Sequence, residues 1–337
     1  MILPRAHYPP RAPDGILVLQ RGENPSTDYY LRPRLGSFAG PTEIADLAAD
    51  PAGSKLLAPG GGRALTVVIC RYASSAWLEA LHGARDRLAR IAFFMDDDLP
   101  EMMRSRDIPA AARGKVALNF AAHAERLEAV CSEVWVSTPT LAERYPETRA
   151  RILSPLSDAE PPPPVADAPP IVVYHGTDVH EREQRFVLEI AARAPEAKFE
   201  IIGDAELVRR AAGLGNVRIT PQLSWPDYRK AQLGRQAAIS LAPLFASALN
   251  DARAPVKAID AARLGAAGLF ADAPAYRSHV RDGVDGVLLP MKPSAWAAAV
   301  GALLADPQRR LRLARAARER QLQSLAEDPG LPAAAAE

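Results

Sequence analysis

The stretch Pro255-Val256-Lys257-Ala258-Ile259-Asp260 opens a helical pattern that extends to Gly265. Proline is favoured in the first turn of a helix and glycine just after its end, so this punctuation predicts one short helix. The helix places Lys257 and Asp260 on one face near its N-terminus, beside unpaired backbone N–H groups that attract anions. This combination suits a sugar attached to a phosphate. Taken alone, the pair is more simply a surface ion pair on an ordinary helix.

The features that follow this helix are a short apolar strand at 268–271 and the turn-rich run Asp282-Gly283-Val284-Asp285-Gly286, then Trp296 and a basic helix. Their order resembles the C-terminal half of GT-B glycosyltransferases, most closely the retaining, family-4-like enzymes, over roughly residues 170–320. The family pattern is Lys-x-x-Glu-x-x-x-x-Gly followed by Asp-Gly-x-x-Gly, and Asp260 stands in the place of the Glu. The resemblance implies that Lys257 meets the diphosphate of a nucleotide-sugar and that Asp260 holds the ribose.

The chain departs from that family upstream of the helix. A second family Glu, eight residues before the first, would fall on Ala252. Contact with the transferred sugar would then have to come from Asn250 or Asp251, or from neither.

Length and composition limit the classes of protein to which the chain can belong. With 337 residues it is long enough for two domains, and 41 basic against 40 acidic residues argue against a dedicated nucleic-acid binder. Cys70 and Cys131 lack a nearby Cys or His at ligand spacing, which indicates buried thiols in a reducing cytoplasm. No apolar run is long enough to span a membrane. The arginine-rich helix expected from Pro307 either closes the fold or touches the inner membrane face peripherally.

Short apolar runs alternate with helical patterns along the whole chain, which predicts an α/β protein with parallel sheets. The segment from Pro161 to Pro170 is proline-rich and cannot continue a helix or a central strand, so it indicates a linker. We therefore expect two Rossmann-like domains with a cleft between them, and the resemblance implies that they are of GT-B type. The expected parts are an acceptor domain at 1–160, the linker at 161–170, a donor domain at 171–306, and a helix with a disordered tail at 307–337.

Three adjacent carboxylates, Asp96, Asp97 and Asp98, follow the apolar strand expected at 91–94. Such a cluster repels itself unless cations or a hydroxyl-rich ligand compensate, so we expect a catalytic role in binding or deprotonating an acceptor hydroxyl. A divalent metal is an alternative, although GT-B enzymes generally work without one and we expect none. Asp96 and Asp98 also resemble the nucleophile motif of haloacid-dehalogenase phosphatases, with Pro100 where that motif has Thr or Val. A helix N-cap explains one of the three.

A second cluster, Tyr174-His175-Gly176-Thr177-Asp178-Val179-His180, follows the first strand after the linker. A strand that leads through Gly into a helix forms an anion site from backbone N–H groups. His175, Thr177 and His180 are therefore expected to contact the phosphate, although a histidine is as often structural. In the resembled family this turn often carries Gly-Arg, and here Gly176 is followed by Thr177, so Arg182 or a histidine would have to replace that Arg.

Two further positions are expected near the nucleotide base. Gly203 ends the strand expected at 199–202, and Gln222 lies in the loop after the next strand. Glycine at the end of an α/β strand is common, so this signal has low specificity.

The resemblance implies a GT-B glycosyltransferase that uses a nucleotide-sugar donor and a saccharide or glycan acceptor. Cytoplasmic synthesis of a bacterial surface polysaccharide or glycoconjugate is the expected setting, with no separate cofactor and no nucleic-acid partner. Two alternatives remain open: a haloacid-dehalogenase-like phosphatase that uses Asp96 and Asp98, and a noncatalytic GT-B-like scaffold.

Overall fold

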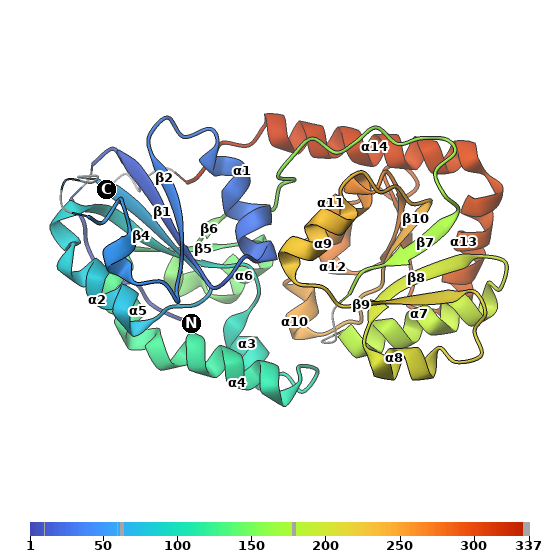
Figure 1. The fold of residues 1–337 in the computed structure, drawn as a ribbon, viewed down its shortest axis with the longest axis horizontal. Helices are drawn as coiled ribbons and strands as arrows, with labels where there is room; N and C mark the ends of the chain where they lie inside the picture. The colour runs from blue at the N-terminus through green and yellow to red at the C-terminus, as the bar shows by residue number, and fades with distance from the viewer. Residues whose placement is uncertain (10, 59, 61–63, 177–179, 333–337) are drawn as a thin grey trace. The chain divides into compact units, whose positions relative to one another are not determined.

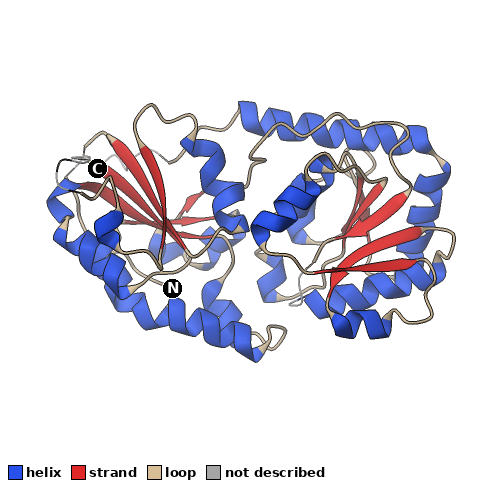
Figure 2. Ribbon diagram, in the orientation of Figure 1, coloured by secondary structure: helices blue, strands red, loops and turns tan. Residues whose placement is uncertain are grey.

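The computed structural model describes residues 1–9, 11–58, 60, 64–176 and 180–332, and the chain forms two compact units. The first contains Met1–Asp158, Ala252–Ala254 and the C-terminal residues from Pro329; the second contains Ala159–Asp251 and Pro255–Asp328. Each unit is built on one parallel six-stranded sheet with helices packed against it (Figures 1 and 2). This confirms the expected α/β fold with two Rossmann-like halves.

The sheet of the first unit has the order β2-β1-β3-β4-β5-β6. Its strands are β1 (Gly15–Gln20), β2 (Thr42–Asp46), β3 (Leu65–Cys70), β4 (Leu88–Met95), β5 (Glu133–Val136) and β6 (Arg151–Ile152). Every residue of β1 and β3 is buried, because a parallel sheet is covered on both faces. Leu17, Val67 and Phe93 on one face belong to the larger core of this unit.

Short helices cover this first sheet. They are the π-helix η1 (Thr27–Leu31), α1 (Arg32–Leu35), α2 (Ser75–Gly83), α3 (Leu99–Arg104), α4 (Ala110–Asn119), α5 (Ala124–Val130) and α6 (Pro139–Arg144), with 3-10 turns η2 (Pro51–Gly53), η3 (Arg85–Arg87), η4 (Ala121–His123) and η5 (Pro146–Thr148). Residues 110–130 form two helices, α4 and α5, where the sequence would also fit a single one. The chain breaks at Phe120, whose ring leaves the helix line and stacks on Phe93 with the centroids 5.5 Å apart.

The sheet of the second unit has the order β12-β11-β10-β7-β8-β9. Its strands are β7 (Ile171–Tyr174), β8 (Lys198–Gly203), β9 (Val217–Pro221), β10 (Ile239–Ala242), β11 (Ala267–Ala271) and β12 (Val287–Leu289). The strand order reverses between β7 and β10 here, and between β1 and β3 in the first unit. In open α/β sheets, ligands bind beyond the carboxyl ends of strands at such a reversal.

The helices of the second unit include α11, the helix expected after Pro255. They are α7 (Glu181–Arg193), α8 (Ala205–Arg210), α9 (Trp225–Gln232), α10 (Ala248–Asp251), α11 (Val256–Arg263), α12 (Pro274–Arg277), α13 (Pro293–Ala305) and α14 (Pro307–Ala326). Gly265 follows α11 with φ +56°, a left-handed conformation that glycine adopts without strain. Leu311, Leu313 and Ala314 on α14 are buried, and α14 packs on α11 and β11. The apolar face of the arginine-rich helix is thus used inside this unit.

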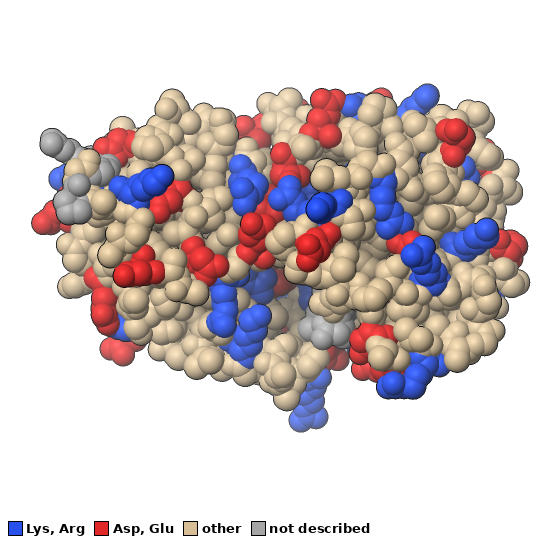
Figure 3. Space-filling view, in the orientation of Figure 1, with Lys and Arg blue, Asp and Glu red and all other residues tan. Residues whose placement is uncertain are grey.

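The surface carries both signs of charge in a mixed pattern. On the face shown in Figure 3, Lys and Arg side chains alternate with Asp and Glu side chains, in keeping with the net charge of +1. Within the described residues, the helices are all too short or too polar to cross a bilayer.

Candidate functional site

The second unit brings two of the expected segments to the strand reversal of its sheet. His175 and Gly176 directly follow β7, and β10, the neighbour of β7, leads through α10 to α11. Both segments therefore leave the sheet at the carboxyl ends of adjacent strands. This is the position at which α/β folds place their ligands.

Lys257 and Asp260 face each other on α11. The Lys257 Nζ donates to Asp260 Oδ2 at 3.0 Å, and the side chains are 32% and 10% exposed. The carboxylate is therefore largely desolvated while the amino group still reaches solvent. A lysine in this setting can exchange its partner for a stronger anion without moving far.

His175 is buried beside this pair and is held by Tyr228 of α9. Its Nδ1 lies 3.0 Å from the Tyr228 hydroxyl, and the two rings meet edge to face. Burial, followed by the positive charge of Lys257, lowers the pKa of His175 to about 4. The imidazole is thus neutral at physiological pH. Its Nε2 is buried and makes no hydrogen bond within the described residues.

Two glycines at this edge are required by close packing. A Cβ on Gly176 would lie 2.3 Å from the Tyr174 hydroxyl, and one on Gly203 would lie 2.3 Å from a methyl group of Leu207. Both distances are too short for any side chain. Glycine at these positions lets the chain turn after β7 and β8 without a clash.

Three charged or polar residues near His175 were not expected from the sequence. Tyr228 is stacked on Trp225, and Glu200 pairs with Arg235 at 2.7 Å. Although burial raises the pKa of Glu200, the hydrogen bond and charge of Arg235 lower it overall. A signal for Tyr228 did exist, because Trp225 and Tyr228 are the two aromatic residues of an otherwise polar helix, three residues apart.

For the other residues expected in the donor site, the contacts that the structure shows are with groups other than Lys257, Asp260 and His175. His180 precedes α7 and lies 3.8 Å from the Glu183 carboxylate; Gln222 is exposed after β9. The Asn250 side-chain amide donates to the Phe245 carbonyl at 2.8 Å. This hydrogen bond stabilises the loop that contains both residues. Thr177 lies outside the described residues.

In the first unit, Asp96 lies beyond the carboxyl end of β4 within a network of polar side chains. Ser26 donates its hydroxyl to Asp96 Oδ2 at 2.6 Å, and Arg71 Nη1 lies 3.0 Å from Asp96 Oδ1. Burial raises the pKa of Asp96, although the Arg71 charge opposes this effect. A carboxylate with a raised pKa is suited to exchange a proton with a hydroxyl.

Arg71 has an uncommon backbone conformation for a residue with a side chain. Its φ is +65°, directly after β3. The left-handed region costs a non-glycine residue about 1 kcal/mol or more. This cost is tolerated at the position from which its guanidinium reaches both Asp96 and Asp97.

Asp97 is the most exposed of the three aspartates, at 25%, and two arginines neutralise it. Arg71 lies 3.2 Å from one carboxylate oxygen, and Arg253 lies 3.8 Å from the other. Arg253 belongs to the segment that the first unit receives from later in the chain, and Thr138 anchors this segment by donating to the Ala252 carbonyl at 2.9 Å. Ala252, which occupies the place of the family's upstream Glu, is 1% exposed.

Asp98 has a different environment from its two neighbours. It caps α3 by accepting from the Glu101 N–H at 2.9 Å, and it also accepts from Arg144 and Tyr145. The residue is 1% exposed. All of its oxygens are thus engaged in holding α3 to α6, which explains the third carboxylate as a structural group.

These contacts show how the chain compensates its acidic cluster. Arg71, Arg253 and Arg144 neutralise the three aspartates. Across the part of the chain that the structure describes, no three His, Cys, Asp or Glu side chains converge as metal ligands would. Asp96 and Asp97 therefore lie in a polar environment in which arginines balance their charge.

The comparison with known families falls on the second unit. The family described as Glycosyl transferases group 1 matches residues 169–306. These residues contain β7, His175, Gly176, Lys257 and Asp260. The matched segment is thus similar to the group 1 glycosyl transferases.

Solved glycosyltransferases share the fold of the whole chain. HepE of Anabaena, in a structure titled as a complex with UDP and glucose, has a TM-score of 0.59 at 14% identity over 92% of this chain and 95% of its own. Sucrose-phosphate synthase of Thermosynechococcus elongatus has a TM-score of 0.56 at 14% identity over 92% and 94%. The chain therefore has the GT-B fold.

TarM from S. aureus also matches, with a TM-score of 0.52 at 12% identity over 78% of this chain, in a structure titled as a complex with fondaparinux, α-GlcNAc-glycerol and UDP. This chain spans about half the length of TarM, 54% in that structure. No curated protein matches its sequence. At these identities the likeness concerns the fold.

Proposed function

We propose that the chain is a glycosyltransferase that moves a sugar from a nucleotide-activated donor to a saccharide or glycan acceptor. The observation that carries the proposal is the Lys257–Asp260 pair, 3.0 Å apart beside the buried, neutral His175 at the strand reversal of the segment that is similar to the group 1 glycosyl transferases. The titles of the HepE structures name UDP and UDP-glucose, which supports a nucleoside-diphosphate sugar as donor.

In this proposal the donor's anionic end lies against the start of α11. Lys257 meets the diphosphate, and Asp260 accepts hydrogen bonds from the vicinal hydroxyls of the ribose. The Nε2 of His175 is available as a neutral hydrogen-bonding group beside them. Cationic and N–H groups at this point stabilise the negative charge that develops on the leaving diphosphate.

We propose that the acceptor hydroxyl is bound by the first unit, at Asp96 and Asp97. Ser26 and Arg71 orient the Asp96 carboxylate, whose raised pKa suits it to accept and return a proton. By analogy with the resembled family, we propose retention of configuration and a role in bacterial surface polysaccharide or glycoconjugate synthesis. The buried, unpaired Cys70 and Cys131 support a cytoplasmic location.

The phosphatase alternative loses support from the environment of Asp98. A haloacid-dehalogenase mechanism needs both Asp96 and Asp98 at the substrate. Asp98 instead caps α3 and accepts from Arg144 and Tyr145, with 1% of its surface exposed. It has no free oxygen with which to transfer a proton to a leaving group.

Nucleotide binding tests the proposal directly. We expect UDP, GDP or CDP to raise the melting temperature of the wild type, because a ligand that binds only the folded state stabilises it. Lys257→Ala should abolish the rise. Lys198→Ala is the matched control, because Lys198 is exposed at the opposite, amino end of β8. Absence of stabilisation by all three nucleotides, or an undiminished rise in Lys257→Ala, would overturn the donor site and favour the scaffold alternative.

A further inference from the structure

His175 carries a buried polar atom for which the described residues offer no partner. The residue is 8% exposed, and its Nε2 makes no hydrogen bond within the described part of the chain. A buried donor or acceptor that stays unpaired destabilises the folded state, so native structures pair nearly all such groups. His175 directly follows β7 at the strand reversal of the second unit. At this place in an α/β fold, a ligand is in a position to supply the partner.

The imidazole of His175 is neutral although charged groups surround it. Lys257 and Asp260 of α11 pair at 3.0 Å, and Arg235 pairs with Glu200 of β8 at 2.7 Å. Burial and the positive charge of Lys257 lower the pKa of His175 to about 4. A neutral imidazole carries its proton on one nitrogen and a lone pair on the other. The chemistry that Nε2 can offer thus depends on what Nδ1 binds.

Tyr228 decides which nitrogen of His175 carries the proton. Its hydroxyl lies 3.0 Å from Nδ1 of the histidine. Burial raises the pKa of Tyr228 well above its ordinary value, so the hydroxyl keeps its proton. The oxygen of a phenol shares a lone pair with the ring, which makes the hydroxyl a better donor than acceptor. We therefore assign the O–H of Tyr228 as the donor to Nδ1, which places the imidazole proton on Nε2.

The Tyr228 ring is held in place by two aromatic contacts. It stacks on Trp225 with the ring centroids 5.5 Å apart, and it meets the His175 ring edge to face with the centroids 5.6 Å apart. Trp225 and Tyr228 are three residues apart, so they share a face of α9. The hydroxyl that binds Nδ1 is thus fixed by α9, whereas His175 belongs to the segment after β7. Together the two elements fix the orientation of Nε2.

We propose that Tyr228 is a positioning residue of the donor site. It orients His175 so that Nε2–H donates a hydrogen bond to a phosphate oxygen of the nucleotide. This inference rests on the proposed function, in which Lys257 leaves Asp260 for the diphosphate. Nε2 is closed to solvent while Lys257 is paired with Asp260, so the bond to phosphate forms as this pair opens. Charged oxygens accept stronger hydrogen bonds than neutral ones, which favours the phosphate over the ribose hydroxyls as the partner of Nε2–H.

Isothermal titration of the full chain with UDP and with uridine tests the proposal, because the two compounds differ only in the diphosphate. Tyr228→Phe keeps the ring and its stack on Trp225 but removes the hydroxyl that selects the tautomer. It should weaken the binding of UDP about fivefold, as expected for one hydrogen bond that is no longer directed, and leave the affinity for uridine unchanged. His175→Leu should weaken UDP binding about tenfold or more, again without an effect on uridine. If GDP or CDP is the nucleotide that stabilises the chain, it replaces UDP together with its nucleoside.

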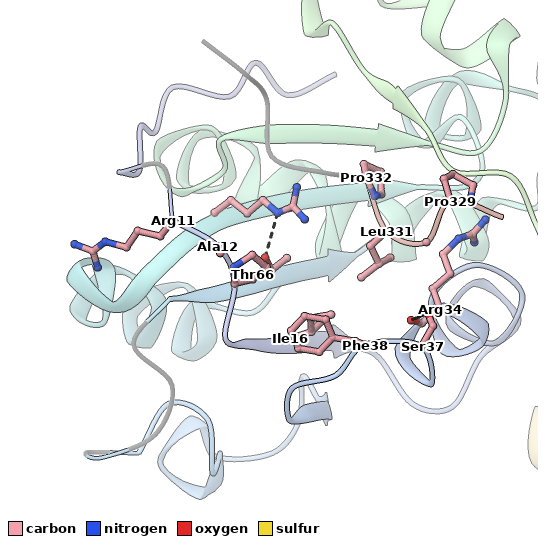
Figure 4. A pocket seen from close by; sticks show the side chains of 13 residues that line it. Arg11, Ala12, Ile16, Arg34, Ser37, Phe38, Thr66, Pro329, Leu331 and Pro332 are labelled. Carbon is pink, nitrogen blue, oxygen red and sulfur yellow. Dashed lines mark hydrogen bonds between the residues drawn. The ribbon is translucent and has the colours of Figure 1, made fainter.

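Two control variants separate this effect from unrelated losses. Tyr8→Phe removes a hydroxyl that donates to the Val130 carbonyl at 2.6 Å in the first unit, so it matches the chemical change at Tyr228. Leu331→Glu alters the wall of a cavity of about 610 Å³ in the first unit, which is large enough to hold a nucleotide (Figure 4). Both variants should bind UDP as the wild type does. Weaker binding in Leu331→Glu would place UDP in that cavity and overturn the proposal.

Nitrogen-15 NMR of the histidine side chains measures the tautomer directly. The signal of His175 is identified among those of the six histidines by comparison with His175→Leu, which lacks it. We expect the proton of His175 to reside on Nε2 in the wild type and to be shared between the two nitrogens in Tyr228→Phe. A proton on Nδ1 in the wild type would overturn the proposal.

The binding data separate this inference from the proposed function. If the wild type binds none of the three nucleotides, the proposed donor site is overturned, and this inference with it. If the wild type binds UDP and Tyr228→Phe binds it equally well, only the inference about Tyr228 is overturned. The same holds if both variants lose as much affinity for uridine as for UDP, because the pair would then support the site without contacting the phosphate.

Discussion

Nδ1 of His175 lies 3.0 Å from the hydroxyl of Tyr228, and this bond fixes a neutral imidazole beside the Lys257–Asp260 pair. The Tyr228 ring also stacks on Trp225, so the position of the residue that bonds His175 is fixed by a second aromatic ring of α9. The histidine is therefore a buried group whose protonation is coupled to the stability of the second unit.

Acidification should destabilise the protein through His175 and His279. Burial lowers the pKa of both to about 4, whereas histidine in an unfolded chain titrates near 6.5. Between these values the unfolded state binds more protons, so stability is present above pH 6.5 and is lost as the pH falls. From pH 7 to pH 5 each histidine should remove about 2 kcal/mol from the free energy of unfolding. Urea unfolding at the two pH values measures the loss. Imidazole NMR signals of both residues that titrate near 6.5 would contradict it.

The backbone of Arg71 can be tested by comparing two substitutions that both remove the guanidinium. Glycine accepts φ +65° without strain and alanine does not, so Arg71→Gly should be more stable than Arg71→Ala by about 1 kcal/mol. At an ordinary strand end, glycine would instead be the less stable of the two. Urea unfolding of both variants gives the difference, and equal stability would show that the left-handed conformation is absent in solution.

Asp98 should affect stability more than chemistry. Asparagine remains a good N-cap, so Asp98→Asn should keep α3 and preserve sugar transfer while losing the ion pair with Arg144. Arg144→Met leaves a carboxylate buried without its cation and should cost about 3 kcal/mol. Urea unfolding and a donor-hydrolysis or transfer assay separate these effects. If Asp98→Asn lost sugar transfer while its free energy of unfolding was unchanged, Asp98 would be a catalytic residue and not a structural one.

Asp285 should be a main attachment of α14. Its side chain is 1% exposed, and it accepts from the Arg281 N–H at 2.7 Å and from the guanidinium groups of Arg281 and Arg320 at 2.8 and 2.7 Å. Asp285→Asn should cost about 2 kcal/mol, because it removes the negative charge that receives the hydrogen bonds of the Arg281 and Arg320 guanidinium groups. Asp282→Asn in the same turn keeps an oxygen acceptor for the Leu288 N–H and should change stability by less than about 0.5 kcal/mol. If both variants lost a similar free energy of unfolding, Asp285 would not be a specific attachment of α14.

The sequence allowed prediction of the parts of the fold that depend on local pattern. The fully buried strands β1, β3 and β11 are mostly apolar runs, and α11 is bounded by Pro255 and Gly265. By contrast, β2 was not anticipated. It is an edge strand with the polar sequence Thr-Glu-Ile-Ala-Asp and partly exposed side chains, so it carries neither an apolar run nor a full alternation.

The candidate site divides in the same way. The Lys257–Asp260 contact could be predicted because residues three apart share a helix face. The contacts of Asp98 with Arg144 and Tyr145, and of Asp97 with Arg253, join residues far apart in the sequence. They depend on how β4, α6 and the returning segment pack together. For this reason the sequence did not reveal which of the three aspartates is the N-cap or which arginine pairs with each.

The returning segment Ala252–Ala254 gives the chain an interleaved domain order. A cut in the proline-rich stretch would not yield two intact halves, because the N-terminal fragment would lack the Arg253 guanidinium that faces Asp97 and the Ala252 carbonyl that Thr138 holds. Recombination between this gene and that of a relative is therefore constrained. If only the N-terminal portion were exchanged, the new first unit would have to pack against the original Ala252–Ala254 segment. Asp96, Asp97 and Arg253, which is encoded far downstream of them, therefore have to be exchanged together.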